Sequence, residues 1–432
     1  MLRGYRYRIY PNREQCSLIE QHFGAVRFVY NRSLFLKNTM YSKFKINISE
    51  MDLNRNLTLI KEHYPWMKDL NSQSLQQVNR NLLNGFKNFF EGTGNYPVKK
   101  SRKDNKFSFQ VPQNYQINLT SSQIYLPKIG WVNIVLHRDF LDDEFIQNEL
   151  VTKEVNGEMI LDQKLNKEFS ILKTVTVSRT SAGRYHVSIL IDDRVPEPNP
   201  VKFDQNSTIG VDVGINRFAT ISNGEEIENP RYLQNSLKKL KKLQKRVSSK
   251  QKGSRNRRKA IQKLAKQHQL IANQRHDFQH KVTTRLISEN QAVATETLNI
   301  KGMMKNHCRA QATSDVAWYS FFQKLEYKAR WYGKTVLKIG QWEPSSKTCS
   351  VCDYYYKDLK DDERTWTCSG CGTIHDRDHN ASHNIKRFAL RNYDNDTVGT
   401  TGRACGHADV GQVEILLGTT RKTEAGSCSV FS

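Results

Sequence analysis

Residues that could bind metal ions crowd together near the carboxyl end of this sequence. The stretch CSGCGTIHDRDHN, residues 368–380, contains a Cys-x-x-Cys pair, two histidines and two aspartates. Thiolates and imidazoles are ligands for zinc, whereas carboxylates hold Mg²⁺ or act as general acids and bases. The stretch is therefore either one metal site or the junction between two.

The cysteines of this stretch have partners upstream. Cys349 and Cys352 form a second Cys-x-x-Cys pair, and fifteen residues separate Cys352 from Cys368. This spacing is typical of a zinc ribbon, in which two loops hold Zn²⁺ tetrahedrally through thiolates. Because four thiolates close the coordination shell, His375 and His379 are not needed as ligands. We predict one structural zinc ion on Cys349, Cys352, Cys368 and Cys371.

Three carboxylates stand out by their positions. Two lie in or directly after apolar runs, where a charge is costly, and the third lies before a predicted helix. Asp212 interrupts the apolar run TIGVDV, Glu296 ends the strand-like run AVAT, and Asp378 can cap the helix that follows it. A buried carboxylate costs free energy unless it is paired or binds a metal. Singly, each position is more often structural. Together, on successive elements of a mixed α/β domain, the three can converge on two Mg²⁺ ions and hydrolyse a phosphodiester.

The charge balance indicates a polyanionic partner. The 432 residues include 67 Lys and Arg against 43 Asp and Glu, a formal net charge of +24. Such an excess is most often a footprint for nucleic acid. The length predicts several domains, and no segment is apolar enough to span a membrane. Half of the eight cysteines fall in the two pairs, which favours metal binding in a reducing cytoplasm over disulfides.

Two helical segments are candidates for contact with nucleic acid. Residues 231–276 contain sixteen Lys and Arg and no acidic residue, which predicts a basic helical hairpin with a narrow apolar stripe. The phosphate-contact candidates there are Lys238, Lys242, Arg246, Arg257 and Arg258. The stretch from 71 to 92 predicts a helix with an apolar face formed by Leu75, Val78, Leu82, Phe86 and Phe89. The opposite face is either solvated or reads DNA bases, and it carries Gln73, Gln76, Gln77 and Arg80.

The remaining sequence must supply the elements that position these residues. GYRYRIY alternates in period two and predicts a strand ended by Pro11, and Asn12 is a candidate cap for a following helix. From about residue 92 to residue 201 the pattern predicts a β-barrel or sandwich, interrupted by an acidic insert at 141–169 to which we assign no role. PEPNP, residues 196–200, predicts a linker, and a new domain is expected near Ser207.

Several of these stretches resemble the TnpB family, the RNA-guided endonucleases of small insertion sequences and ancestors of the type V CRISPR effectors. The resemblance rests on GVDVGINRFAT, TETLNI, LEYKARWYGKTV, PSSKTCSVC, RTWTCSGCG and HDRDHNASHNI, with FGAVRFVYN near the amino end. It implies that Asp212, Glu296 and Asp378 are the catalytic carboxylates, and that Asp376 shapes the turn before Asp378. One departure is Asp353, which stands where the first zinc loop of the family usually has glycine. Since Asp tolerates left-handed backbone, we expect the loop to keep its shape.

The resemblance implies a multi-domain α/β protein. Its parts would be an RNase H-like (RuvC) nuclease domain at 206–348 and 373–395, with the basic hairpin inserted at 231–290, and a zinc ribbon at 349–372. A β-barrel wedge domain at 1–11 and 93–205 would contain a helical recognition lobe at 12–92, and residues 396–432 would form a C-terminal tail.

The implied activity is RNA-guided, Mg²⁺-dependent cleavage of DNA beside a short target-adjacent motif. Two catalytic Mg²⁺ ions and one structural Zn²⁺ would be the cofactors, and guide RNA from the transposon end and double-stranded target DNA would be the partners of a monomeric, cytoplasmic ribonucleoprotein. A nuclease-inactive RNA-guided repressor is an alternative, which the intact carboxylates disfavour. A DNA transposase is another, for which the sequence shows no second set of strand-transfer residues.

Overall fold

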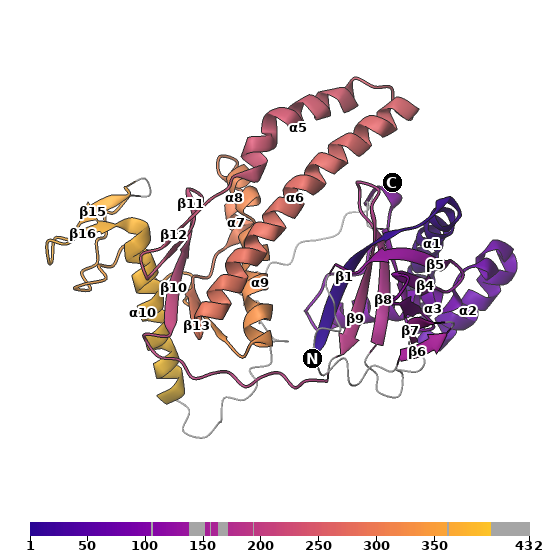
Figure 1. Ribbon diagram of the computed structural model, residues 1–432, viewed down its shortest axis with the longest axis horizontal. Coiled ribbons are helices and arrows are strands. Elements are labelled where there is room, and N and C mark those ends of the chain that lie inside the picture. The colour runs from indigo at the N-terminus through magenta and orange to yellow at the C-terminus, as the bar shows by residue number, and fades with distance from the viewer. Residues whose placement is uncertain are drawn as a thin grey trace.

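The structure is a computed structural model that describes residues 1–104, 107–137, 152–155, 157–162, 172–192, 194–360 and 363–398. Most of the tail at 396–432 and the outer parts of the acidic insert lie outside these residues. The described chain forms two lobes, one on each side of Figure 1, with a long helical hairpin rising from one of them. The chain passes from the first lobe to the second through the segment between residues 192 and 208.

The first lobe is built on a nine-stranded antiparallel sheet with the order β2-β8-β9-β1-β5-β4-β3-β7-β6. Its strands are β1 (Leu2–Tyr10), β2 (Phe107–Val111), β3 (Gln116–Asn118), β4 (Gln123–Leu126), β5 (Gly130–Val135), β6 (Thr152–Val155), β7 (Glu158–Asp162), β8 (Leu172–Arg179) and β9 (Tyr185–Asp192). The predicted amino-terminal strand is confirmed by β1, whose Tyr7 and Ile9 are buried in the core of this sheet. Within the acidic insert, β6 and β7 extend the edge of the sheet.

Three helices pack beside this sheet: α1 (Arg13–Phe44), α2 (Glu50–His63) and α3 (Ser72–Phe90). Short 3-10 turns at Pro65–Asp69 and Arg102–Asp104 complete the connections. Asn12 caps α1 as predicted, because its side chain accepts the N–H of Gln15. On α3 the first four residues of the predicted apolar face are buried, and they are Leu75, Val78, Leu82 and Phe86. Phe89 is 38% exposed, so its assignment to that core is wrong; it lies in the last turn of the helix.

The second lobe contains a five-stranded sheet with the order β12-β11-β10-β13-β14. Its strands are β10 (Thr208–Val213), β11 (Arg217–Ile221), β12 (Glu226–Glu228), β13 (Ala292–Thr295) and β14 (Thr335–Lys338). Strands β10, β13 and β14 run parallel, so the residues at their carboxyl ends meet at one edge of the sheet. Helix α10 (Arg377–Val398) packs on β10, where it lies so close to Gly210 that a Cβ there would meet the Ser382 carbonyl oxygen at 2.0 Å.

The other face of this sheet packs on α6 (Arg255–Glu289) and α9 (Trp318–Trp331), through side chains such as Leu286 and Phe321. Helices α5 (Tyr232–Ser248) and α6 occur where the sequence predicts the basic hairpin, and Figure 1 shows them extending away from the sheet. Two short helices, α7 (Ile300–Met303) and α8 (Ala310–Val316), precede α9. The two-stranded sheet of β15 (Thr365–Thr367) and β16 (Ile374–Asp376) leads into α10. Among the described residues, no helix is both long and apolar enough to cross a bilayer.

Candidate metal sites

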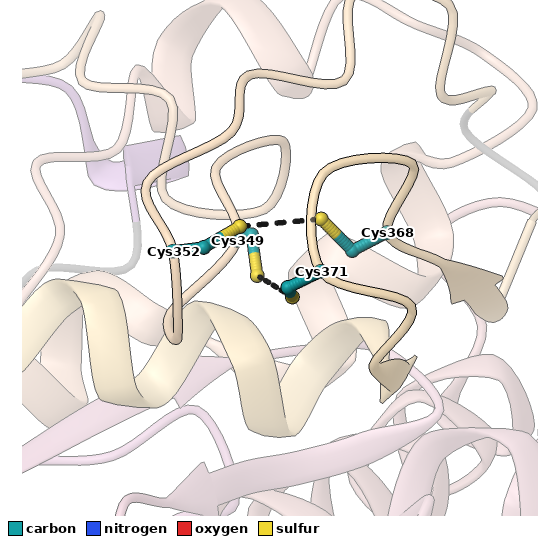
Figure 2. Close-up of side chains that lie close together, drawn as sticks. All are labelled: Cys349, Cys352, Cys368 and Cys371. Carbon is teal, nitrogen blue, oxygen red and sulfur yellow. Dashed lines mark hydrogen bonds between the residues drawn. The ribbon is translucent and has the colours of Figure 1, made fainter.

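The four paired cysteines converge as the sequence predicts. They lie in two loops that face one another in Figure 2, and their sulfur atoms are all within 4.8 Å of one another. The Sγ atoms of Cys349 and Cys371 are 3.7 Å apart, and those of Cys352 and Cys368 are 3.5 Å apart. A tetrahedron with zinc–sulfur bonds of about 2.3 Å has sulfur–sulfur edges of about 3.8 Å. The donor set and its dimensions therefore fit Zn²⁺.

The loops that hold these cysteines use left-handed backbone. Asp353 has φ of +62° and Gly372 has φ of +74° at equivalent places after the two Cys-x-x-Cys pairs. Asp353 donates its N–H to the Cys349 carbonyl oxygen at 3.1 Å, and Gly372 donates to that of Cys368 at 2.8 Å. The expectation that aspartate keeps the first loop in shape is confirmed. Its carboxylate also forms an ion pair of 2.5 Å with Arg387 on α10.

The two histidines of the 368–380 stretch are not members of the cysteine cluster. His375 lies on β16, with Nε2 3.0 Å from Cys349 Sγ and its ring against Trp366. His379 lies in the first turn of α10, and its Nε2 is 2.8 Å from a carboxylate oxygen of Glu226. His375 therefore adjoins the sulfur cluster from outside, and His379 belongs to a neighbouring network of charged groups.

Two of the three predicted carboxylates lie on adjacent parallel strands. Asp212 is in β10, and Glu296 directly follows β13, whose Thr295 pairs with Val211. Burial raises the pKa of Asp212 well above its usual range, and the charges of Glu296 and Asp378 raise it further. Burial likewise raises the pKa of Glu296 to about 7, although a hydrogen bond from the Val213 backbone opposes this. The charges of Glu296 and Asp378 thus act on Asp212. Among the described residues, the group whose ligand atoms lie close enough together to hold one ion is the four cysteines, and it does not include these carboxylates.

The start of α10 separates the roles of two aspartates. Asp376 Oδ1 accepts the backbone N–H of Asp378 and that of His379, both at 3.0 Å, so Asp376 caps the helix. The prediction that Asp378 is the cap is wrong. Either aspartate could cap the helix, and the sequence does not reveal which of the two directly precedes its first turn. Since Asp378 is the second residue of α10, its carboxylate is available for other partners.

Two arginines that the sequence did not single out neutralise this carboxylate cluster. Arg364 Nη1 lies 3.0 Å from Asp378 Oδ1, and Arg217 Nη1 lies 4.0 Å from Asp378 Oδ2. Arg217 also binds Asp376 at 3.2 Å and Glu226 at 2.9 Å. A hairpin after Asp212 could have suggested Arg217, because β11 returns beside β10. No local pattern indicates Arg364, which approaches from the zinc-binding segment.

Buried amides join the zinc-binding segment to α10. Asn380 accepts the Ser350 N–H at 2.9 Å and donates to the Thr348 carbonyl oxygen at 2.7 Å. One turn later, Asn384 donates to the carbonyl oxygens of Ser345 at 2.8 Å and Thr348 at 2.5 Å. Both amides are at least 98% buried. The helix that carries Asp378 is therefore bonded to the loop that carries the first zinc-binding pair.

The predicted nucleic-acid contacts lie on two separate elements, away from these clusters along the chain. On α3, Gln76 and Arg80 are exposed, but Arg80 forms a 3.2 Å ion pair with Glu50. Gln73 and Gln77 are half-buried and bond to neighbouring amides. The five basic candidates of the hairpin have no ion pair with a described carboxylate; all are exposed except the half-buried Arg257, and they are Lys238, Lys242, Arg246, Arg257 and Arg258.

Three family descriptions match different parts of the chain. Residues 187–307 match the OrfB_IS605 family, described as "Probable transposase". Residues 318–385 match "Cas12f1-like, TNB domain", and residues 1–45 match "Helix-turn-helix domain". The last match spans one strand and a single long helix in this structure.

Curated relatives match over most of the chain. A protein of Streptomyces pristinaespiralis, named "Putative RNA-guided DNA endonuclease", is 36% identical over 90% of this chain and 89% of its own length. InsQ of Escherichia coli, which carries the same description, is 29% identical over 89% of this chain and 91% of its own length. Among solved structures, a Cas12f1–sgRNA–target DNA complex is similar with a TM-score of 0.46 and 13% identity, covering 89% of this chain and 98% of that one. The chain belongs to the TnpB-like OrfB_IS605 family.

Proposed function

We propose that this protein is an RNA-guided, Mg²⁺-dependent DNA endonuclease of a transposable element. The observation that carries the proposal is the set of Asp212, Glu296 and Asp378, in which burial raises the pKa values of Asp212 and Glu296, and the charges of Glu296 and Asp378 raise that of Asp212 further. Such groups are costly to keep unless a cation binds them. The family membership and the net charge of +24 supply the nucleic-acid context.

Asp212, Glu296 and Asp378 would hold two Mg²⁺ ions, which supply a metal-activated water and stabilise the leaving oxygen of the phosphodiester. The protein's own contribution would be to carry Asp212 and Glu296 on neighbouring strands and to fix the start of α10, which carries Asp378, through the Asp376 cap. Arg364 and Arg217 compensate the negative charge in the free protein, and they would be available to a DNA phosphate once cations bind the carboxylates.

We propose that each domain has the function that the family resemblance implies. The nine-stranded sheet and the three helices would be the wedge domain and recognition lobe, and the five-stranded sheet would be the RuvC-like nuclease domain. Guide RNA pairing would select the target, while the protein reads a short adjacent motif with the α3 face of Gln73, Gln76, Gln77 and Arg80. The α5–α6 hairpin would bind nucleic-acid backbone, since phosphate contacts position a duplex without reading its sequence.

The decisive experiment compares wild type with Asp212→Asn, which keeps the shape of the side chain and removes its charge. Each protein is purified with its co-purifying RNA, and that RNA is sequenced to define the guide. Matched and mismatched DNA duplexes are then incubated with Mg²⁺. We expect wild type to cleave only the matched duplex, and the variant to be at least about 10³-fold slower, because a metal ligand has been lost.

Binding and cleavage must be read separately in this assay. The variant should still bind the matched duplex when divalent ions are absent, since base pairing and basic residues carry binding. Cleavage without guide, or cleavage by Asp212→Asn at the wild-type rate, would refute the proposal. Guide-dependent binding with no cleavage by wild type would favour a repressor instead.

A further inference from the structure

One buried histidine lies against the sulfur cluster without being needed as one of its ligands. His375 is 7% exposed and is the middle residue of β16. Its Nε2 lies 3.0 Å from Cys349 Sγ. Its ring packs on the indole of Trp366, its cross-strand partner on β15, with the ring centroids 4.7 Å apart. Packing therefore fixes the orientation of the ring independently of its contact with sulfur.

The contact between His375 and Cys349 has one possible direction once the cysteine is a zinc ligand. Cysteine binds zinc as the thiolate, which has lost its proton and can only accept a hydrogen bond. Nε2 must then carry a proton and donate it to Sγ. A neutral ring with its proton on Nδ1 would instead turn a lone pair toward the sulfur, and two lone pairs repel one another.

The sulfur atoms need donors because four thiolates leave a zinc site with excess negative charge. Cys349 is 0% exposed and Cys368 is 1% exposed, so water does not solvate their sulfur atoms. In the second loop, the backbone N–H of Gly370 donates to Cys368 Sγ at 3.3 Å. In the first loop, His375 supplies Cys349 with a donor from a buried side chain. Such partners orient a metal ligand and tune how tightly it binds.

The strand that carries His375 also reaches the carboxylate region. Successive side chains of a strand point to opposite faces, so His375 faces the sulfur cluster and Asp376 faces away from it. Asp376 accepts the backbone N–H groups of Asp378 and His379 and so caps α10. Because β16 has three residues and belongs to a two-stranded sheet, its ladder alone holds it weakly. The contact with Cys349 ties it to the loop of the first cysteine pair.

We propose that His375 is a positioning residue of the zinc site: its Nε2–H donates a hydrogen bond to the Cys349 thiolate, which helps to retain zinc and holds β16 against the loop of the first cysteine pair. The ring itself does not bind the metal. Without this N–H, a buried thiolate has one donor fewer and binds zinc less tightly. The inference goes beyond the proposed nuclease activity, because it concerns how the protein retains zinc.

Two substitutions separate the N–H group from the ring. His375→Phe keeps an aromatic ring against Trp366 and removes the donor, whereas His375→Gln removes the ring and keeps a donor at a similar reach. Zinc affinity of the full chain is measured by competition with a chelator of known affinity at constant pH. We expect His375→Phe to bind zinc about 10- to 100-fold more weakly. His375→Gln should stay close to wild type, and so should the control His307→Phe, whose site is exposed.

The charge-transfer band of the Co²⁺-substituted protein tests the hydrogen bond itself. An N–H donor lowers the energy of the sulfur lone pair, so the thiolate-to-cobalt band should move to longer wavelength in His375→Phe and stay in place in His375→Gln. Amide hydrogen exchange in residues 374–376 should be faster in the Phe variant. An unmoved band or unchanged exchange in the Phe variant overturns the proposal. Equal losses of zinc affinity in the two variants also overturn it, since they would assign the role to packing of the ring.

A measurement on wild-type protein decides the question even if His375→Phe fails to fold. Protein labelled with ¹⁵N in histidine alone reports the tautomer of each ring through its nitrogen chemical shifts. The His375 signals are identified by their loss in His375→Gln. We expect a proton on Nε2, and a proton on Nδ1 alone would overturn the proposal. Since every readout concerns zinc or the ring, failure of the proposed nuclease activity leaves these results interpretable.

Discussion

Glu296 shows how a single environment sets both stability and cation binding. Its carboxyl group follows a strand whose four residues are all buried, and burial raises its pKa to about 7. In the unfolded chain the same group ionises near its ordinary value of about 4.3. Between these two values the folded state holds a proton that the unfolded state has released. The metal-free protein therefore becomes less stable as the pH rises through this range. The whole destabilisation by ionised Glu296 is present above pH 7.

Replacing Glu296 with glutamine should remove this penalty. We expect metal-free Glu296→Gln to be more stable than wild type by about 1 to 3 kcal/mol above pH 7, and equally stable near pH 4. Denaturant unfolding at several pH values, in chelator chosen to spare zinc, measures the difference. If the gap between the two proteins did not widen with pH, burial of an ionised Glu296 would not be the cause. The variant should also lose cleavage, which separates stability from function.

Asp376 and Asp378 can be told apart by the same conservative change. Asn at position 376 can still accept the N–H groups of Asp378 and His379, so Asp376→Asn should retain most cleavage and lose only its ion pair with Arg217. Asp378→Asn should abolish cleavage while the helix cap remains. Cleavage rates at saturating Mg²⁺ decide this, and the opposite ranking would move the metal-binding role to Asp376.

The sequence predicts some members of the two sites far better than others, for physical reasons. The zinc ligands are predictable because both Cys-x-x-Cys pairs are local patterns whose spacing follows from tetrahedral geometry. Asp212 and Glu296 are predictable because a carboxylate in an apolar strand conflicts with its surroundings. Arg364 is not, since its partner is 14 residues away on another element. Its exposed segment carries no signal that separates it from any other surface arginine.

At the level of elements, α10 links the zinc-binding segment to the nuclease sheet. Asn380, Asn384 and Arg387 recur at helical spacing and face the zinc-binding segment, where they contact its backbone or Asp353. Ile385 and Phe388 lie on the face that packs against the five-stranded sheet. The helix is thus held by contacts on two faces. These contacts also fix the position of Asp378, which lies in its first turn.

Removing one of these amides should loosen both sites together. Asn384→Ala leaves the buried carbonyl oxygens of Ser345 and Thr348 without this donor, and we expect a loss of about 2 to 4 kcal/mol in unfolding free energy. Zinc should also pass to a chelator faster than from wild type, as a colorimetric zinc assay can follow. Asn392→Ala is the matched control, because Asn392 lies on the same helix but bonds to Glu343. Equal zinc release from the two variants would show that Asn384 does not couple the sites.

The sequence predicts a helix or strand where one hydrophobic period dominates, but it does not predict which strands pair with one another. Alternation over residues 2–10 and the apolar stripe of α3 identify their elements directly. Phe89 was misassigned because periodicity continues into a last turn that has no core beneath it. The parallel pairing of β10 with β13 joins residues separated by a whole helical hairpin, and no local pattern encodes it. The β6–β7 hairpin was missed because its residues are weakly patterned.

At the level of the whole molecule, positive charge is concentrated on the α5–α6 hairpin, whose outer part extends away from the sheet in Figure 1. Leu240 and Val247 on α5 and Ile271 on α6 are buried, so the hairpin keeps a narrow apolar contact. Ile261, an apolar residue near the start of α6, is 42% exposed. The hairpin therefore has a thin core and a broad cationic surface.

Neutralising that surface should weaken nucleic-acid binding without unfolding the protein. We expect glutamine at Lys238, Lys242 and Arg246 together to lower the slope of log affinity against log salt by about 2 to 3 for duplex DNA. The unfolding temperature should stay within a few degrees, since all three side chains are exposed. A triple variant with glutamine at Lys301, Lys305 and Lys357, which are exposed and lie outside the hairpin, serves as the control. An unchanged slope would place the phosphate contacts elsewhere.

The segment between β9 and β10 carries the chain from one lobe to the other once only within the described residues. Each hydrophobic cluster is built from residues on one side of that passage. A polypeptide cut within Pro196–Pro200 would therefore divide the protein without dividing any core. Two separately produced halves should each fold and then reassemble on a shared nucleic acid, which would make this nuclease a natural candidate for control by fragment complementation.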